Sequence, residues 1–191
     1  MKFHRCCSIA LLAFAVHLAP ALAQSPAKLV PAQSEVAFVT KQMGVPVDGR
    51  FKKFDAQISL DPKNPSAGSV AFSVDTGSAS LGVPESDAEM PKAIWFNIAK
   101  FPQATFKSTA IKGLGNGKFE VAGKLDIKGS TRDIVVPVLI TQANGQSTAT
   151  GSFVIKRLDF KIGEAEWTDT TVVANDVTVK FKLALTGLGP L

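Results

Sequence analysis

The sequence predicts an all-β fold in which eight antiparallel strands close into a barrel or stack as a two-sheet sandwich. Most segments after residue 33 alternate apolar and polar residues, and short stretches rich in Gly, Pro and Asn separate them. A period of two places every second side chain on the same face of a strand. Such faces need a common interior, and an eight-stranded barrel either fills it with side chains or holds one small ligand there.

The expected strands follow one another with short connections, which favours antiparallel pairing. The two clearest, residues 118–129 and 176–186, put Phe119, Val121 and Leu125, or Val179 and Phe181, on one face. Within 130–141, Pro137 predicts an edge position or a bulge, because proline cannot donate to a ladder. The full set of expected strands is 34–41, 49–60, 69–75, 104–112, 118–129, 130–141, 147–156 and 176–186.

Residues 82–97 depart from this alternation. Pro84 and Pro91 each suit the first turn of a short helix. We therefore expect a short helical insert that caps one end of the barrel. Acidic residues near a helix start, here Asp87 and Glu89, are ordinary helix-capping residues.

The amino-terminal segment has the pattern of a cleavable signal peptide. Lys2 and Arg5 precede an apolar run over residues 6–18, and Ala21-Leu22-Ala23 supplies small residues at the cleavage site. The run is shorter than the roughly 20 residues that span a bilayer. We expect residues 1–23 to be removed and residues 24–191 to form one exported domain.

Cleavage would remove both cysteines and both histidines, which all lie within residues 1–23. No disulfide is then expected, and neither imidazole-based catalysis nor a zinc, haem or copper site. The formal net charge falls from +5 to +3, because Lys2 and Arg5 leave. That balance is too weak to predict nucleic-acid binding but is compatible with transient contact with an anionic membrane surface. We expect a binding protein without metal or catalytic cofactor.

The acidic residues near the carboxyl end allow one enzymatic alternative. Glu164, Glu166 and Asp169 lie close together in the sequence, and a carboxylate-based hydrolase would need two acids at a fixed spacing across a cleft. A solvated loop before the last strand explains the same pattern. The lysines on the polar faces of the strands likewise fit a solvated surface or a docking patch for anionic head groups.

Aromatic side chains are the most informative group. Residues 24–191 contain eleven phenylalanines together with Trp95 and Trp167. Several phenylalanines fall on the inward face of their strand, where they form either a solid core or the wall of a cavity. Periodicity does not distinguish the two, because a filled barrel alternates in the same way.

Four stretches carry a resemblance to a known family: Gly49-Arg50-Phe51 with Phe54, and residues 63–70, 100–109 and 121–131. Together they resemble the YceI-like family of secreted polyisoprenoid-binding proteins, over about residues 28–187. The resemblance implies a lipocalin-like barrel with a helical cap and an apolar tunnel for an amphiphile with a polyisoprenoid tail, such as a quinone or a polyprenyl diphosphate. It also implies a periplasmic location and no enzymatic activity.

On this basis we expect particular inward side chains to line the tunnel. Trp95 and Phe96 would close one end from the helical insert. The bound molecule would be a long-chain isoprenoid or another amphiphile, carried by a monomer or homodimer; a promiscuous, stress-protective binder of hydrophobic compounds is the alternative. The expected lining residues are Phe38, Phe51, Phe54, Phe72, Trp95, Phe96, Phe106, Phe119, Leu125, Phe153 and Phe181.

The sequence departs from the family pattern at two places. Many relatives carry a histidine after the first strand, where this chain has Gln42-Met43-Gly44. Many carry Arg-Asp-x-His-Leu in the insert, where residues 86–90 retain only Asp87. If those basic groups bind an anionic head group, their loss favours a neutral one, such as a quinone.

Overall fold

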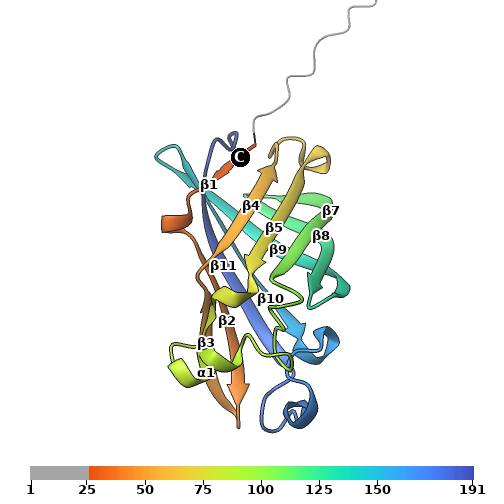
Figure 1. The fold of residues 1–191 in the computed structure, drawn as a ribbon. Coiled ribbons are helices and arrows are strands. Elements are labelled where there is room, and N and C mark those ends of the chain that lie inside the picture. Colours follow the sequence, from red (N-terminus) through yellow and green to blue (C-terminus); the bar gives the residue numbers. More distant parts are fainter. Residues whose placement is uncertain (1–25) are drawn as a thin grey trace, which may run out of the picture.

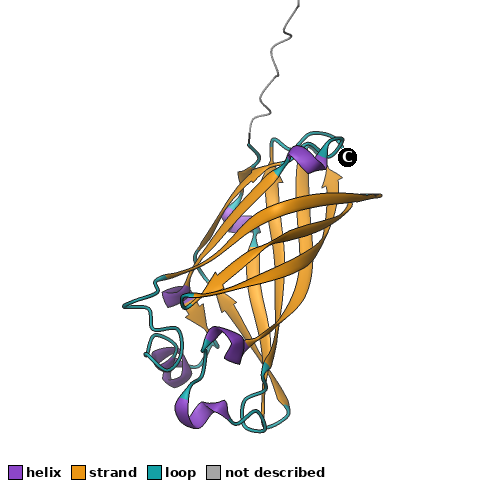
Figure 2. Cartoon of the chain, turned by 90° about the vertical axis from the view of Figure 1, so that its right-hand side faces the viewer, coloured by secondary structure: helices purple, strands orange, loops and turns teal. Residues whose placement is uncertain are grey.

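The computed structural model describes residues 26–191, so the expected signal peptide lies outside the described residues. The strands form an elongated, closed antiparallel barrel (Figures 1 and 2). The short helix α1 (Pro84–Glu89) lies at one end, and the carboxyl terminus lies beside β1 (Lys28–Leu29) at the other (Figure 1). Of the two predicted architectures, the eight-stranded barrel with a short helical insert is confirmed.

Each expected strand is present, although several bounds differ. The long strands are β2 (Glu35–Gln42), β3 (Val45–Phe51), β4 (Phe54–Ser59), β5 (Ser69–Asp75), β7 (Gln103–Gly115), β8 (Lys118–Ile127), β9 (Ser130–Ala143), β10 (Gln146–Lys156) and β11 (Asp176–Thr186). Two short strands, β1 (Lys28–Leu29) and β6 (Ala79–Ser80), complete the sheet. The strand order is β4-β5-β7-β8-β9-β10-β11-β2-β3-β6, and β1 pairs with β11.

The expected single strand over residues 49–60 is wrong in one respect, because the chain bends at Lys52-Lys53 into β3 and β4. β3 pairs with β2, whereas β4 pairs with β5 at the opposite end of the strand order. The bend therefore carries the chain across the seam at which the sheet closes. Near the far end of this seam, the backbone N–H of Ala27 donates to the carbonyl of Ile58 at 2.7 Å.

Pro137 lies where one ladder of the barrel ends. β9 pairs with β8 along most of its length, and Pro137 stands opposite Glu120. The pairing of β9 with β10 is shorter: it begins with Ala143 opposite Gln146 and ends with Val138 opposite Gly151. The predicted edge position is therefore found locally, on the β10 side of a strand that is otherwise interior to the sheet.

The insert contains one short helix, α1 (Pro84–Glu89), with Pro84 in its first turn as expected. The Asp87 carboxylate accepts hydrogen bonds from Ser80 Oγ and from the backbone N–H of Leu81, both at 2.6 Å, which attaches α1 to β6. These hydrogen bonds, with the Ser80 hydroxyl first, lower the pKa of Asp87. We call α1, residues 90–98 and residues 157–175 together the cap.

Two buried apolar clusters occupy the barrel interior. One includes Ile111, Ile140 and Leu185, toward the end away from the cap. The other includes Trp95 and Phe160, at the cap. Phe51 and Phe106 pack against both clusters, so the apolar interior is continuous along the barrel.

Candidate functional site

A cavity of about 380 Å³ occupies the barrel interior, lined by the inward faces of the strands and by the cap. Pockets for small ligands typically measure about 300–1,000 Å³ and are mostly apolar. The interior is therefore not filled by the protein's own phenyl rings, and the alternative of a sandwich without a cavity is wrong.

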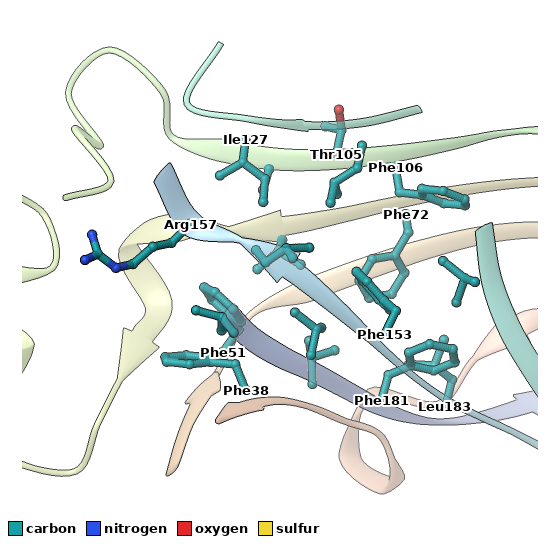
Figure 3. A pocket seen from close by; sticks show the side chains of 18 of the residues that line it. Phe38, Phe51, Phe72, Thr105, Phe106, Ile127, Phe153, Arg157, Phe181 and Leu183 are labelled. Carbon is teal, nitrogen blue, oxygen red and sulfur yellow. The ribbon is translucent and has the colours of Figure 1, made fainter. Parts of the chain in front are cut away.

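Ten of the eleven expected lining residues border this cavity: Phe38, Phe51, Phe72, Trp95, Phe96, Phe106, Phe119, Leu125, Phe153 and Phe181. Figure 3 shows aromatic side chains from separate strands, among them Phe38, Phe72 and Phe153, facing the same space. Phe54 is the exception. It stacks on Phe72 with ring centroids 6.0 Å apart and lines a depression beside the bend at Lys52-Lys53. Phe54 shares a face of β4 with Ile58, which borders the cavity, but it lies beside the bend and its ring packs on Phe72 outside the cavity lining.

Three of the phenylalanine rings lie over glycines of the barrel wall. A Cβ added at Gly49 would lie 2.2 Å from the Phe38 ring, and one at Gly151 would lie 2.4 Å from the Phe181 ring. The same relation joins Gly123 and Phe106, at 2.5 Å. Because these glycines have no side chain, the rings rest against the sheet and leave the centre of the barrel open.

The polar residues of the cavity wall are concentrated toward the cap. Thr40 and Gln42 lie at the end of β2, Ser86 and Glu89 belong to α1, and Arg157 begins the cap segment after β10. Thr105 is the remaining polar lining residue, and its hydroxyl points away from the other side chains in Figure 3. The wall at the opposite end is formed by aliphatic residues such as Ile111, Ile140 and Leu185. The cavity thus has a partly polar end and an apolar end.

Arg157 is 2 % exposed, and its guanidinium donates only to backbone carbonyls. Nε donates to Ala174, Nη1 to Ile162 and Gly163, and Nη2 to Val173 and Trp167, at distances of 2.5–3.0 Å. Burial lowers the pKa of this group. All five N–H donors of an arginine are engaged here, so none is left for an anionic ligand. The side chain instead holds residues 162–174 over the end of the barrel.

Sequence reasoning missed Arg157, although a signal for it was present. Arg157 directly follows β10 and continues the period of two set by Phe153 and Ile155, which predicts an inward side chain. A charged residue on that face indicates a buried group with dedicated partners. Thr40 was missed in the same way, because it continues the inward series of Val36 and Phe38.

Two buried polar atoms of the cavity wall have no hydrogen-bond partner within residues 26–191. They are Thr40 Oγ1 and Trp95 Nε1, and the two residues are 9 % and 8 % exposed. Trp95 packs against Trp167, with ring centroids 5.5 Å apart. Buried polar groups are usually paired, because leaving one unsatisfied is unfavourable by about 1–3 kcal/mol.

The carboxylates considered for hydrolysis are bound by their own chain. Glu164 Oε2 accepts from Lys128 Nζ at 2.9 Å, and this lysine also donates to the Lys161 carbonyl at 2.6 Å. Asp169 accepts from the hydroxyl and backbone N–H of Thr171, which lower its pKa. Neither acid borders the cavity. No cluster of three or more potential metal ligands (His, Cys, Asp or Glu) occurs in the described part of the chain.

The depression beside the β3–β4 bend is the second feature of interest. It is lined by Arg50, Lys52 and Lys53 together with Glu35, and Phe51 borders both this depression and the cavity. Within residues 26–191, none of the three cationic side chains lies in an ion pair. A cationic surface therefore lies next to the apolar interior.

None of the helices described in residues 26–191 has the length and hydropathy needed to cross a membrane.

Comparisons with known proteins agree on the family. The sequence profile of the YceI-like domain matches residues 28–185. The crystal structure of BcnA from Burkholderia cenocepacia is similar, with 41% identity, a TM-score of 0.80, and coverage of 82% of this chain and 99% of that one. A polyisoprenoid binding domain from Saccharophagus degradans shares the fold at 20% identity, with a TM-score of 0.67 and coverage of 84% and 97%.

Curated relatives match over a shorter stretch. A UPF0312 protein from Vibrio cholerae is 39% identical over 106 residues, which are 55% of this chain and 56% of that protein. Protein YceI from Salmonella arizonae is 39% identical over 88 residues, or 46% of each chain. The chain thus spans about half the length of the curated relatives it matches.

Proposed function

The chain belongs to the family of YceI-like domains, and we propose that it is a carrier that holds an isoprenoid-type amphiphile, a quinone or a polyprenyl lipid, in its barrel. The observation that carries this proposal is the cavity, which is continuous with both apolar clusters and open at its centre. The related fold of a polyisoprenoid binding domain supports the same class of ligand.

The driving force for binding would be removal of the tail from water. Burial of about 400 Å² of apolar tail at about 25 cal/mol per Å² contributes on the order of 10 kcal/mol before ordering costs. The ten aromatic and aliphatic side chains named above as bordering the cavity would supply the contacting surface. No catalytic step is part of this proposal.

A neutral head group fits the cavity wall better than a diphosphate. Arg157 is the one cationic residue of that wall, and its donors are all engaged by carbonyls. A diphosphate buried without charged partners is strongly unfavourable. This supports a quinone over a prenyl diphosphate.

We further propose that the carrier works in the periplasm and approaches a membrane surface transiently. The signal-peptide pattern of residues 1–23 supports export. The surface formed by Arg50, Lys52 and Lys53 supports attraction to anionic lipids, at about 1 kcal/mol for each cation near the membrane.

The direct test is to purify the protein from the periplasm without detergent, extract it with organic solvent and identify bound lipid by mass spectrometry. An isoprenoid lipid at near-stoichiometric amount is the expected result. A wide mixture of unrelated hydrophobic compounds would instead indicate a sequestering role, and absence of any lipid would contradict the proposal.

A pair of adjacent residues in β10 provides a matched variant test. Phe153 borders the cavity, whereas Val154 points outward and is 57% exposed. Phe153→Asp should abolish uptake of a fluorescent prenyl lipid, while Val154→Asp should leave it intact. Equal uptake by both folded variants would count against a ligand in the barrel.

A further inference from the structure

The two unpartnered polar atoms at the cap end of the cavity are the starting point. Trp95 Nε1 can only donate a hydrogen bond, and Thr40 Oγ1 can donate one. Both residues border the cavity, and no protein group within residues 26–191 accepts from either atom. A ligand atom that accepts hydrogen bonds at this end of the cavity would therefore satisfy both donors.

From this geometry we infer that the head group of the ligand lies at the cap, where its neutral oxygen acceptor receives hydrogen bonds from Trp95 Nε1 and Thr40 Oγ1. The tail then extends along the apolar end toward Ile111, Ile140 and Leu185. This inference rests on the proposed function, and it adds the orientation of the ligand and the chemical class of its head group.

The distribution of polarity gives an independent reason for this orientation. The polar lining residues Thr40, Gln42, Ser86 and Glu89 all belong to the end of β2 or to α1, whereas the far end of the wall is aliphatic. A head group placed at the far end would lose its hydrogen bonds to water without replacement, which is unfavourable. At the cap, the same group exchanges water for two donors that are otherwise unsatisfied.

The chemistry of the two donors also restricts the head group. A quinone carbonyl or an ether oxygen accepts from both an indole N–H and a hydroxyl. Glu89 is ion-paired with Lys92, and Arg157 has no free N–H, so neither charged lining residue offers a free cation to a diphosphate. A pure hydrocarbon would leave both donors unpaired.

Conservative variants isolate the two hydrogen bonds. Trp95→Phe removes the N–H and keeps an aromatic ring, while Thr40→Val removes the hydroxyl at nearly constant shape. Trp167→Phe and Thr105→Val are the matched controls, since they delete the same groups from lining residues whose polar atoms are not among the buried unpartnered ones. Three probes are used: a tetraprenyl benzoquinone, the corresponding tetraprenyl hydrocarbon, and tetraprenyl diphosphate.

Wild-type protein should bind the quinone most tightly. Trp95→Phe and Thr40→Val should each weaken quinone binding about three- to ten-fold and leave hydrocarbon binding unchanged. The melting temperature of the ligand-free variants should be unchanged or higher, because an unsatisfied buried group has been removed. A purely structural role would instead lower the melting temperature and weaken both probes.

Fluorescence reports the orientation directly. The chain has two tryptophans, Trp95 and Trp167, and both lie in the cap. A quinone head at the cap should quench most of the intrinsic fluorescence, and the hydrocarbon should not. Weak quenching by a bound quinone would place the head at the far end and overturn the inference.

The probes separate failure of the inference from failure of the proposed function. Equal affinity for quinone and hydrocarbon, or tighter binding of the diphosphate, would overturn the inference while the barrel remained a carrier. Failure of all three probes to bind would refute the proposed function and the inference with it.

Discussion

Gly49→Ala should narrow the cavity from the wall inward. The new Cβ would lie 2.2 Å from the Phe38 ring, whereas ordinary contact begins at 3.4 Å, so the ring edge must move by at least 3.4 − 2.2 = 1.2 Å. The three atoms closest to the added Cβ all belong to this ring, which borders the cavity. The ring can therefore yield only by swinging away from the sheet and into the lumen.

The magnitude follows from overpacking and lost contact. Overpacking typically destabilises by about 1–3 kcal/mol, partly offset by about 0.4–1 kcal/mol because alanine restricts the unfolded chain. We expect a net loss of about 0.5–2 kcal/mol in the free energy of unfolding. If the ring displaces about 50 Å² of tail contact, binding weakens by about 1.2 kcal/mol, or about eight-fold.

Urea unfolding and displacement of a fluorescent prenyl lipid measure the two effects. Phe38→Leu is the matched background, because a smaller side chain leaves room for the new methyl group. Gly49→Ala should then have little effect on either measurement. The reasoning would be refuted if Gly49→Ala bound the lipid like the wild type, or if its effects were the same with and without Phe38.

Three further predictions concern the cap and the cationic depression. Arg157→Leu should lower the free energy of unfolding by about 3–5 kcal/mol, because it leaves buried carbonyls unpaired. Arg157→Lys should lower this free energy by less. Urea unfolding that showed no change for Arg157→Leu would contradict the role assigned to this side chain. Hydrogen bonds lower the pKa of Asp87 in the folded protein relative to the unfolded chain. The ionised carboxylate therefore stabilises the folded protein at any pH above its unfolded-state pKa, and this contribution is lost as pH falls through the lower folded-state pKa. Below about pH 4 the cap should therefore loosen, which tryptophan fluorescence would report. The fluorescence change should be smaller in Asp87→Asn and should persist in Asp169→Asn. Replacing Lys52 and Lys53 by Glu should reduce binding to phosphatidylglycerol vesicles at low salt at least about tenfold. The same charge change at the exposed residues Lys180 and Lys182 should not reduce it. An equal loss of vesicle binding in both variants would assign the effect to net charge alone.

Strand positions were predictable because period two is a local property. The residues of β8 and β11 alternate without interruption, and both strands occur where expected. The break between β3 and β4 also left a trace, since Phe51 and Phe54 are three residues apart and cannot share a face of one regular strand. The β2–β3 turn at Met43-Gly44 was missed, although its positive φ angles of 48° and 80° suit a tight hairpin.

The site was predictable in its aromatic part and less so in its polar part. Inward phenylalanines follow from alternation, whereas an open cavity depends on where the rings rest, which in turn depends on glycines in neighbouring strands such as Gly49 and Gly151. The pairing of Gly151 with Phe181 is long-range in sequence, and that of Phe38 with Gly49 depends on the β2–β3 hairpin, whose turn was missed. The partners of Arg157 are likewise backbone carbonyls of an irregular segment, and such segments have no periodicity from which a contact can be predicted.

The interruption beside Pro137 has a mechanical consequence. Residues of β9 before Val138 pair only with β8, and residues of β10 after Gly151 pair only with β11. The circumference of the barrel can therefore increase along this unpaired stretch between β9 and β10 without breaking any hydrogen bond between strands. A solvent-exposed hydrogen bond of 2.8 Å from Arg132 Nη2 to the Asp159 carbonyl connects β9 to the segment that follows β10. Accommodation of a bulkier guest would thus stretch a side-chain tether and spare the sheet itself.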